Sequence, residues 1–152
     1  MYKSFTTSLF ALALVVLFAG SCKKSDTAPL PLTKTQLLSQ SSWTFLSATA
    51  SGTDVTNNAA LTCFKDNIIT FSSNGSFTIN EGINICSPST AGSFTWSFQA
   101  SETQLVLSAP LIPGGSSTFT LVTLNGTNLI ISQNVTIPPS PTAIPVVFTF
   151  KH

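Results

Sequence analysis

The sequence of 152 residues contains no arginine, a single histidine and few charged residues of any kind. Charged side chains make up 7% of the residues, and the formal net charge is +1. Nucleic acid binding normally requires a clustered basic surface, which these scattered lysines do not provide, so we exclude nucleic acid as a partner. Disorder would require low hydrophobicity, whereas 43% of the residues are hydrophobic. The composition therefore predicts a folded domain whose surface is covered mainly by Ser, Thr and Asn.

The shortage of histidine also limits catalysis, because a nucleophile needs a base. His152 is the last residue of the sequence, where we expect fraying. Among the five scattered carboxylates, Asp66 and Glu81 could form a glycosidase pair. We favour the alternative that Asp66 pairs with a lysine such as Lys65 or accepts hydrogen bonds from backbone amides at a turn. Metal-ligand spacings and phosphate-binding glycine loops are also lacking, so we predict no enzyme activity, no metal and no cofactor.

One long apolar run is present, and it is too short to span a membrane. It covers eleven residues, 9–19, after the positive charge of Lys3. At about 1.5 Å per residue it reaches about 16 Å, against a hydrocarbon core of about 30 Å. A positive start, an apolar run and small residues before a cleavage point are typical of a secretory signal. A plain signal peptide that happens to precede Cys22 is one interpretation.

We prefer a second interpretation, in which Cys22 is part of the signal. Residues 17–22, Leu-Phe-Ala-Gly-Ser-Cys, resemble the lipobox of bacterial lipoproteins, with Ala19 where that family usually has Leu. The resemblance implies cleavage before Cys22, acylation of that cysteine with fatty acids such as palmitate, and an N-terminal lipid anchor. We expect the protein to lie in the bacterial cell envelope, at the outer membrane. Residues 1–21 would then be the signal peptide, 22–32 a proline-containing tether, and 33–152 the folded domain.

The remaining two cysteines, Cys63 and Cys86, form an even pair in a compartment where disulfides persist. We expect a disulfide between them. A reactive thiol or a metal pair is the less favoured alternative, since neither a histidine nor a third cysteine accompanies them.

The pattern of the domain predicts an all-β fold. Thr33 and Gln36 resemble a capping box and predict a short helix over 34–40. From Trp43 onward, apolar and polar residues alternate with the period of half-buried strands. We predict eight strands, at 43–50, 67–72, 76–81, 92–99, 103–108, 117–124, 128–133 and 145–151. With no helices between them, these strands favour an antiparallel up-and-down barrel, whose closure removes the exposed sheet edges.

The turn at Asn74 and Gly75 tests the register of one hairpin. A two-residue turn would pair apolar with polar residues on each face, whereas a three-residue loop over 73–75 pairs Phe71 with Phe77. The second register, with Gly75 in a left-handed conformation, keeps the core side chains together, and we predict it.

Two proline-rich loops, 109–116 and 134–145, interrupt the strand pattern. We interpret them as long connections that are extended and stiff. The alternative is that they are arms that contact a partner.

Several features in a fixed order resemble the lipocalin-like domains of bacterial lipoproteins. They are the helix, Trp43, the sequence Cys-Phe-Lys-Asp-Asn at 63–67, Cys86 and the strand Gly-Ser-Phe-Thr-Trp at 92–96. The first strand starts with Ser-Ser-Trp instead of the Gly-x-Trp of lipocalins. The resemblance covers about 32–152 and implies a small eight-stranded barrel with a lipid anchor, which binds ligand only by analogy with true lipocalins.

Alternation predicts which side chains face the interior of the barrel. They are Trp43, Phe45, Ile69, Phe71, Phe77, Ile79, Phe94, Trp96, Phe98, Leu105, Leu107, Phe119, Leu121, Leu129, Ile131, Phe148 and Phe150. These side chains fill the barrel in one interpretation, and line a cavity for a small hydrophobic ligand in the other. The candidate ligand-binding residues are Trp43, Phe45, Phe71, Phe77, Phe94, Trp96, Phe98, Phe119 and Phe148.

Two functions therefore compete. The first is non-catalytic binding of a small hydrophobic ligand by a monomeric, lipid-anchored barrel. The second is a solid barrel that contacts or inhibits another protein through its proline-rich loops. An enclosed apolar cavity of about 300 Å³ or more would favour the first function, and a closed core with ordered proline loops would favour the second.

Overall fold

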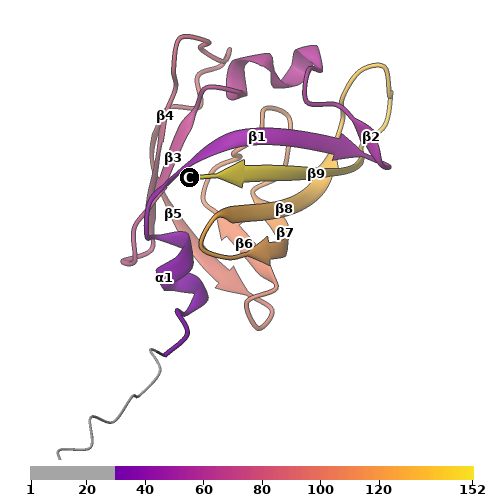
Figure 1. Ribbon diagram of the computed structural model, residues 1–152. Coiled ribbons are helices and arrows are strands. Elements are labelled where there is room, and N and C mark those ends of the chain that lie inside the picture. Colours follow the sequence, from indigo (N-terminus) through magenta and orange to yellow (C-terminus); the bar gives the residue numbers. More distant parts are fainter. Residues whose placement is uncertain (1–29) are drawn as a thin grey trace, which may run out of the picture. The chain divides into compact units, whose positions relative to one another are not determined.

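The structure is a computed structural model that describes residues 30–152 (Figure 1). The lipobox-like segment, Cys22 and the tether up to residue 29 lie outside the described residues. Residues Pro31–His152 form one compact unit. Its elements are α1 (Lys34–Leu38), β1 (Ser42–Ala50), β2 (Thr53–Asp54), the short 3-10 helix η1 (Ala59–Phe64), β3 (Ile68–Phe71), β4 (Ser76–Asn80), β5 (Gly92–Gln99), β6 (Gln104–Leu107), β7 (Thr118–Leu124), β8 (Asn128–Val135) and β9 (Ile144–Lys151).

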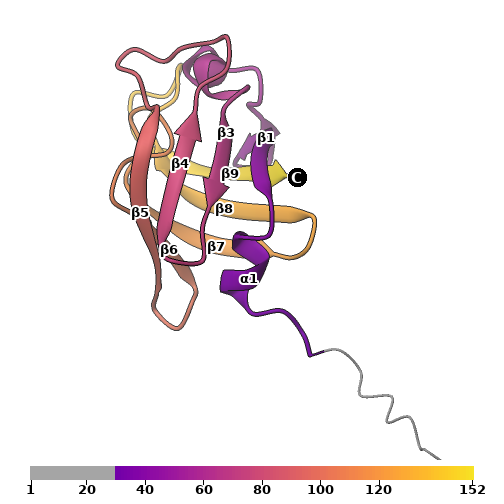
Figure 2. The same cartoon turned by 90° about the vertical axis from the view of Figure 1, so that its left-hand side faces the viewer.

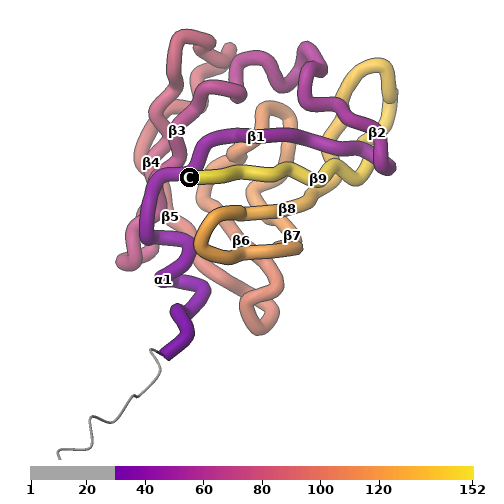
Figure 3. The backbone as a smooth tube through the Cα atoms, viewed as in Figure 1, coloured from indigo at the N-terminus to yellow at the C-terminus, as the bar shows by residue number. Residues whose placement is uncertain are grey.

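The strands close into an antiparallel barrel, as the alternation predicts. Each strand from β3 to β8 pairs with the next along the chain, β1 pairs with β3, and β9 returns to pair with β1 (Figure 3). Eight strands form the closed barrel, and the two-residue β2 pairs antiparallel with the end of β1. The register shifts once in β1 and once in β7, and such bulges increase the local bend of a strand.

The predicted strands agree with the observed ones to within two residues at each end. The sequence did not indicate β2 or η1, so the prediction of a single helix beside the strands was wrong. The loop between the last two strands is shorter than the predicted 134–145, because β8 continues to Val135 and β9 begins at Ile144. Pro145 is tolerated near the start of β9, where a missing N–H disturbs the ladder least.

The hairpin between β3 and β4 has the predicted register. Phe71 lies opposite Phe77 and Ile69 opposite Ile79. Gly75 adopts a φ of +84°, a left-handed conformation that glycine reaches without steric cost. The interior face of this hairpin is therefore continuous and apolar.

One end of the barrel, here called the helix end, is closed by α1 (Figure 2). Thr33 and Gln36 form the predicted capping box, although the helix ends at Leu38 and not at residue 40. Leu38 is buried, and its carbonyl oxygen accepts a 2.9 Å hydrogen bond from Trp43 Nε1. His152, which we expected to fray, packs on Trp43 in a tilted arrangement with ring centroids 3.8 Å apart. The first and last strands are thus fastened together at the helix end.

The interior of the barrel is filled by side chains. Of the seventeen predicted inward residues, all are buried except Phe94, Phe98 and Leu121, which are half-buried against the same core. Several interior aromatic rings pack edge to face, as Phe45 and Phe64 do with centroids 5.2 Å apart, whereas Phe71 and Phe77 stack.

The opposite end, here called the loop end, carries η1 and the long loops 81–91, 108–117 and 136–143 (Figure 2). Apolar side chains from η1 and two of these loops are fully or almost fully buried in the core; they are Leu61, Phe64, Leu111, Ile112 and Ile137. The strand pattern did not indicate this contribution. Because these side chains come from connections between strands, the loops plug the barrel at this end.

Candidate functional site

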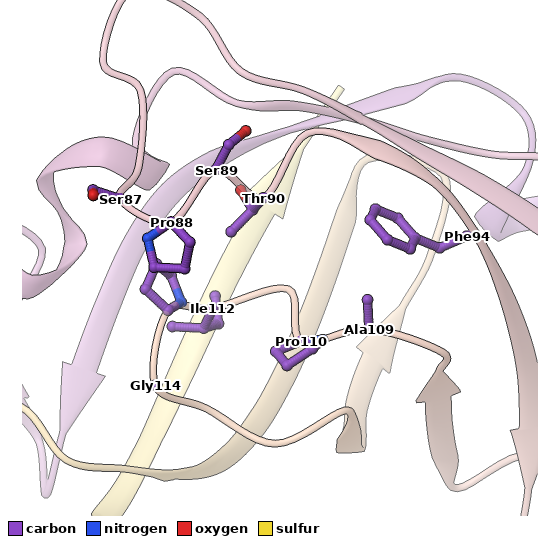
Figure 4. A pocket seen from close by; sticks show the side chains of 10 residues that line it. Ser87, Pro88, Ser89, Thr90, Phe94, Ala109, Pro110, Ile112 and Gly114 are labelled. Carbon is purple, nitrogen blue, oxygen red and sulfur yellow. The ribbon is translucent and has the colours of Figure 1, made fainter.

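An apolar groove lies at the loop end, between the loops 81–91 and 108–117 (Figure 4). We call it the rim groove, and its volume is about 380 Å³. It is lined by Ser87, Pro88, Ser89, Thr90, Phe94, Ala109, Pro110, Ile112, Pro113 and Gly114. None of these residues is charged. A concave site of this size, with apolar walls and a few polar groups, is typical of small-ligand pockets.

A disulfide fixes the middle of the loop that forms one wall of the groove. Cys63, at the end of η1, is bonded to Cys86, with their Cα atoms 4.9 Å apart. This confirms the predicted pairing. Cys86 directly precedes the wall residues Ser87 and Pro88, so the bond holds the wall close to η1.

Glu81, the first residue of the same loop, holds it through hydrogen bonds to residues further along the loop. Its carboxylate accepts hydrogen bonds from the Ser89 hydroxyl at 2.6 Å, from the backbone N–H and hydroxyl of Thr90 at 2.8 Å each, and from the Cys86 N–H at 3.3 Å. The Ser89 hydroxyl, the Thr90 backbone N–H and the Thr90 hydroxyl lower the pKa of Glu81 from 4.5 to about 2, and the Cys86 N–H adds to them against a partial desolvation. The two wall hydroxyls therefore donate to Glu81.

Asp66 holds the tip of the loop. Its Oδ2 accepts hydrogen bonds from the N–H groups of Ile83 at 2.7 Å and Asn84 at 3.1 Å, and from the Asn84 side-chain amide. The Asn84 and Ile83 backbone N–H groups lower the pKa of Asp66, against partial desolvation. A Cβ on Gly82 would lie 2.5 Å from Asp66 Oδ2, so this close approach requires glycine.

These contacts decide between the two interpretations of Asp66. The expectation that it accepts hydrogen bonds from backbone amides is confirmed, whereas Lys65 donates to Asn57 instead. A glycosidase acid needs a raised pKa, and the pKa values of both Asp66 and Glu81 are lowered. The two carboxylates shape a loop.

The nine aromatic candidates for ligand binding lie in different surroundings. Phe94 lines the rim groove and packs on Phe77, with ring centroids 5.3 Å apart. The others belong to or pack against the core; Phe71 and Trp96, for example, meet edge to face with centroids 5.8 Å apart. Their role in ligand binding stays a prediction.

Most of the groove was not foreseen from the sequence. Its prolines at 110 and 113 belong to the loop 109–116, which the sequence singled out for its proline content. The wall at 87–90 gave no such signal, since its position depends on the disulfide and on hydrogen bonds to Glu81. Alternation identifies strand residues and says nothing about how loops pack.

The described residues 30–152 contain neither a membrane-spanning helix nor a cluster of metal ligands. Across this part of the chain, the helices fall short of the length and apolarity required to cross a membrane. Over the same residues, no three His, Cys, Asp or Glu side chains are grouped so that they could hold a metal ion.

Comparison with known proteins identifies the family. No match was found among the curated proteins. A family model for the lipocalin-like domain matches residues 41–131, from the start of β1 into β8. The matched segment includes both bonded cysteines and every residue that lines the rim groove. With its closed antiparallel barrel and this match over more than half of its length, the chain belongs to the lipocalin-like domain family.

Proposed function

We propose that this protein is a lipid-anchored lipoprotein of the bacterial outer membrane that binds a small, uncharged, apolar molecule without catalysis. The rim groove carries the proposal, because it offers about 380 Å³ of largely apolar space within a family whose fold suits small ligands. The filled barrel moves the expected site from the interior to the rim.

The surroundings of the groove favour an uncharged ligand. Its lining contains no charged side chain, and the Glu81 carboxylate lies directly behind Ser89 and Thr90. An anionic ligand would lose its hydration without a cation to bind it, and it would also be repelled by Glu81.

The lipid anchor is supported by the sequence around Cys22. The lipobox resemblance assigns the first of the three cysteines to lipid, and the other two form the disulfide of the domain. A disulfide is typical of compartments outside the cytoplasm, as an envelope lipoprotein requires.

A fluorescence titration tests the ligand site. N-phenyl-1-naphthylamine is an uncharged apolar probe, and anilinonaphthalene sulfonate is an anionic probe of similar shape. We expect the neutral probe to bind more tightly, and Ala109→Trp, which fills the groove, to weaken its binding at least about tenfold. Val122→Trp, at an exposed site on the barrel wall, is the matched control and should leave binding unchanged. Equal binding to the wild type and Ala109→Trp would refute a ligand site in the groove.

The anchor has a separate test. Wild-type protein should sediment with the membrane fraction of its host and label with a palmitate analogue, and Cys22→Ala should do neither. Labelling of Cys22→Ala, or membrane association of that variant without label, would contradict anchoring through this cysteine.

A second candidate function is favoured by the closed core. The interior is filled, and Leu111 and Ile112 from a proline-rich loop plug one end of the barrel. A barrel without an internal cavity is what we expect of a module that contacts other proteins. Native mass spectrometry of protein purified from its host separates the two functions. A co-purifying small molecule supports ligand binding, and repeated absence of one favours the interaction module.

A further inference from the structure

The tip of the loop 81–91 presents two apolar side chains to solvent. Ile83 is 94% exposed and Ile85 is 70% exposed. The backbone between them is held by Asp66, whose carboxylate accepts the N–H groups of Ile83 and Asn84. The isoleucines therefore project from a fixed loop and form a knob, defined here as Ile83 and Ile85.

Apart from Asp66, which holds the knob from behind, and its neighbour Lys65, which bonds to Asn57, the surroundings of the knob carry little charge. The loops 81–91, 108–117 and 136–143 contain one charged residue, Glu81, and its carboxylate is turned inward to Cys86, Ser89 and Thr90. Interfaces between proteins are depleted of charge at their centres. The two exposed isoleucines therefore fit an apolar partner surface best.

The rim groove is such a surface, and it lies on the same loop as the knob. The knob occupies 83–85, and the groove wall follows at 87–90. In a twofold dimer the same surface patch of both copies meets. The patch must therefore contain both a protruding group and a depression that accepts that group from the other copy. A knob next to an apolar groove meets this condition.

We infer that two copies of this chain associate at their loop ends, with the knob of each copy seated in the rim groove of the other. Because each copy contributes two exposed isoleucines and one groove, we expect a weak, reversible dimer and not an obligate one. The inference replaces the expectation of a monomer and does not require that the groove bind a small ligand.

Chain connectivity argues against the anchoring membrane as the occupant. The described chain enters the domain at Pro31 and passes directly into α1, at the helix end of the barrel. The knob lies at the loop end, on a loop without lysine or arginine to attract anionic lipid. An apolar protein surface therefore fits the knob better than a bilayer.

Sedimentation velocity over a wide concentration range tests the dimer. The sample is the chain from residue 22 onward with Cys22→Ser, which retains the whole barrel and removes the acylation site. We expect a reversible monomer–dimer equilibrium. Ile83→Ser combined with Ile85→Ser should weaken it at least about tenfold, since each substitution acts twice in a twofold dimer. Leu46→Ser combined with Val122→Ser removes comparable exposed apolar groups from the barrel wall and should leave it unchanged.

A mixing experiment tests whether the knob of one copy binds in the rim groove of the other. Ala109→Trp blocks the groove but keeps the knob, and the double serine variant lacks the knob but keeps the groove. Each should be monomeric alone, and a mixture should form a heterodimer with one knob in one groove, weaker than the wild-type dimer.

Three results would overturn the inference: monomeric wild type at all concentrations, an unchanged dimer in the double serine variant, or no association in the mixture. Knob-dependent binding to vesicles of neutral lipid by a monomeric protein would assign the knob to membrane instead. The double serine variant should still bind N-phenyl-1-naphthylamine, so failure of the dimer and failure of the ligand site are distinguishable.

Discussion

Removing the disulfide tests how much of the stability depends on constraining the unfolded chain. Cys63 and Cys86 are separated by 23 residues. A cross-link that closes a loop of this length lowers the entropy of the unfolded state by an amount worth about 3.4 kcal/mol at room temperature. For a domain of 122 residues, from Pro31 to His152, this corresponds to a fall in Tm of about 13 °C. We therefore expect Cys63→Ala combined with Cys86→Ala to unfold at a clearly lower temperature.

Circular dichroism and calorimetry provide the assay, and reduction provides the control. Wild type treated with dithiothreitol after unfolding should lose as much stability as the double alanine variant, which should itself be insensitive to the reagent. The strand signal should persist at room temperature, since most of the core lies outside the bonded loop. A fall in Tm of less than about 3 °C would refute the argument, because it would mean that the unfolded chain is not constrained by the bond.

Three further predictions follow from single side chains. The lowered pKa of Glu81 stabilises the fold above the ordinary value of 4.5, and this contribution is lost as the pH falls toward about 2. Chemical denaturation should show that Glu81→Gln lacks this pH dependence and is least affected at the acid end. Trp43→Phe leaves the carbonyl of Leu38 without its donor, so we expect a loss of about 2 kcal/mol in urea unfolding. Gly75→Val forces a branched residue to a φ of +84° and should cost about 2 kcal/mol by the same measurement, with Ser73→Val as a control in the same turn.

The barrel could be predicted because its strands alternate clearly. In β5, Trp96 is buried between the exposed residues Thr95 and Ser97, and this contrast indicates both the strand and its inward face. The hairpin register followed from one requirement, that Phe71 face Phe77. Periodic burial is a local signal, and a single sequence carries it.

The rim groove could not be predicted, because its walls meet through contacts between distant segments. Pro88 and Pro110 come from different loops, and neither belongs to a periodic pattern. Glu81 and Asp66 were recognised as candidate chemistry, yet their contacts with backbone N–H groups show that they fix a loop. Distinguishing a catalytic carboxylate from a structural one requires the donors around it, which the sequence does not place.

The restraints on the loop 81–91 indicate that its shape matters for function. Fixing the backbone of a residue costs about 1–2 kcal/mol of conformational entropy, so a connection without a role gains nothing from being held. This loop is nevertheless held at its start by Glu81, at its tip by Asp66 and in its middle by the disulfide of Cys86. The restraints also keep Ile83 and Ile85 exposed, which opposes the burial that stability alone would favour. A loop fixed in a conformation that exposes apolar side chains is best explained by a contact made there, and both proposals place that contact at the loop end.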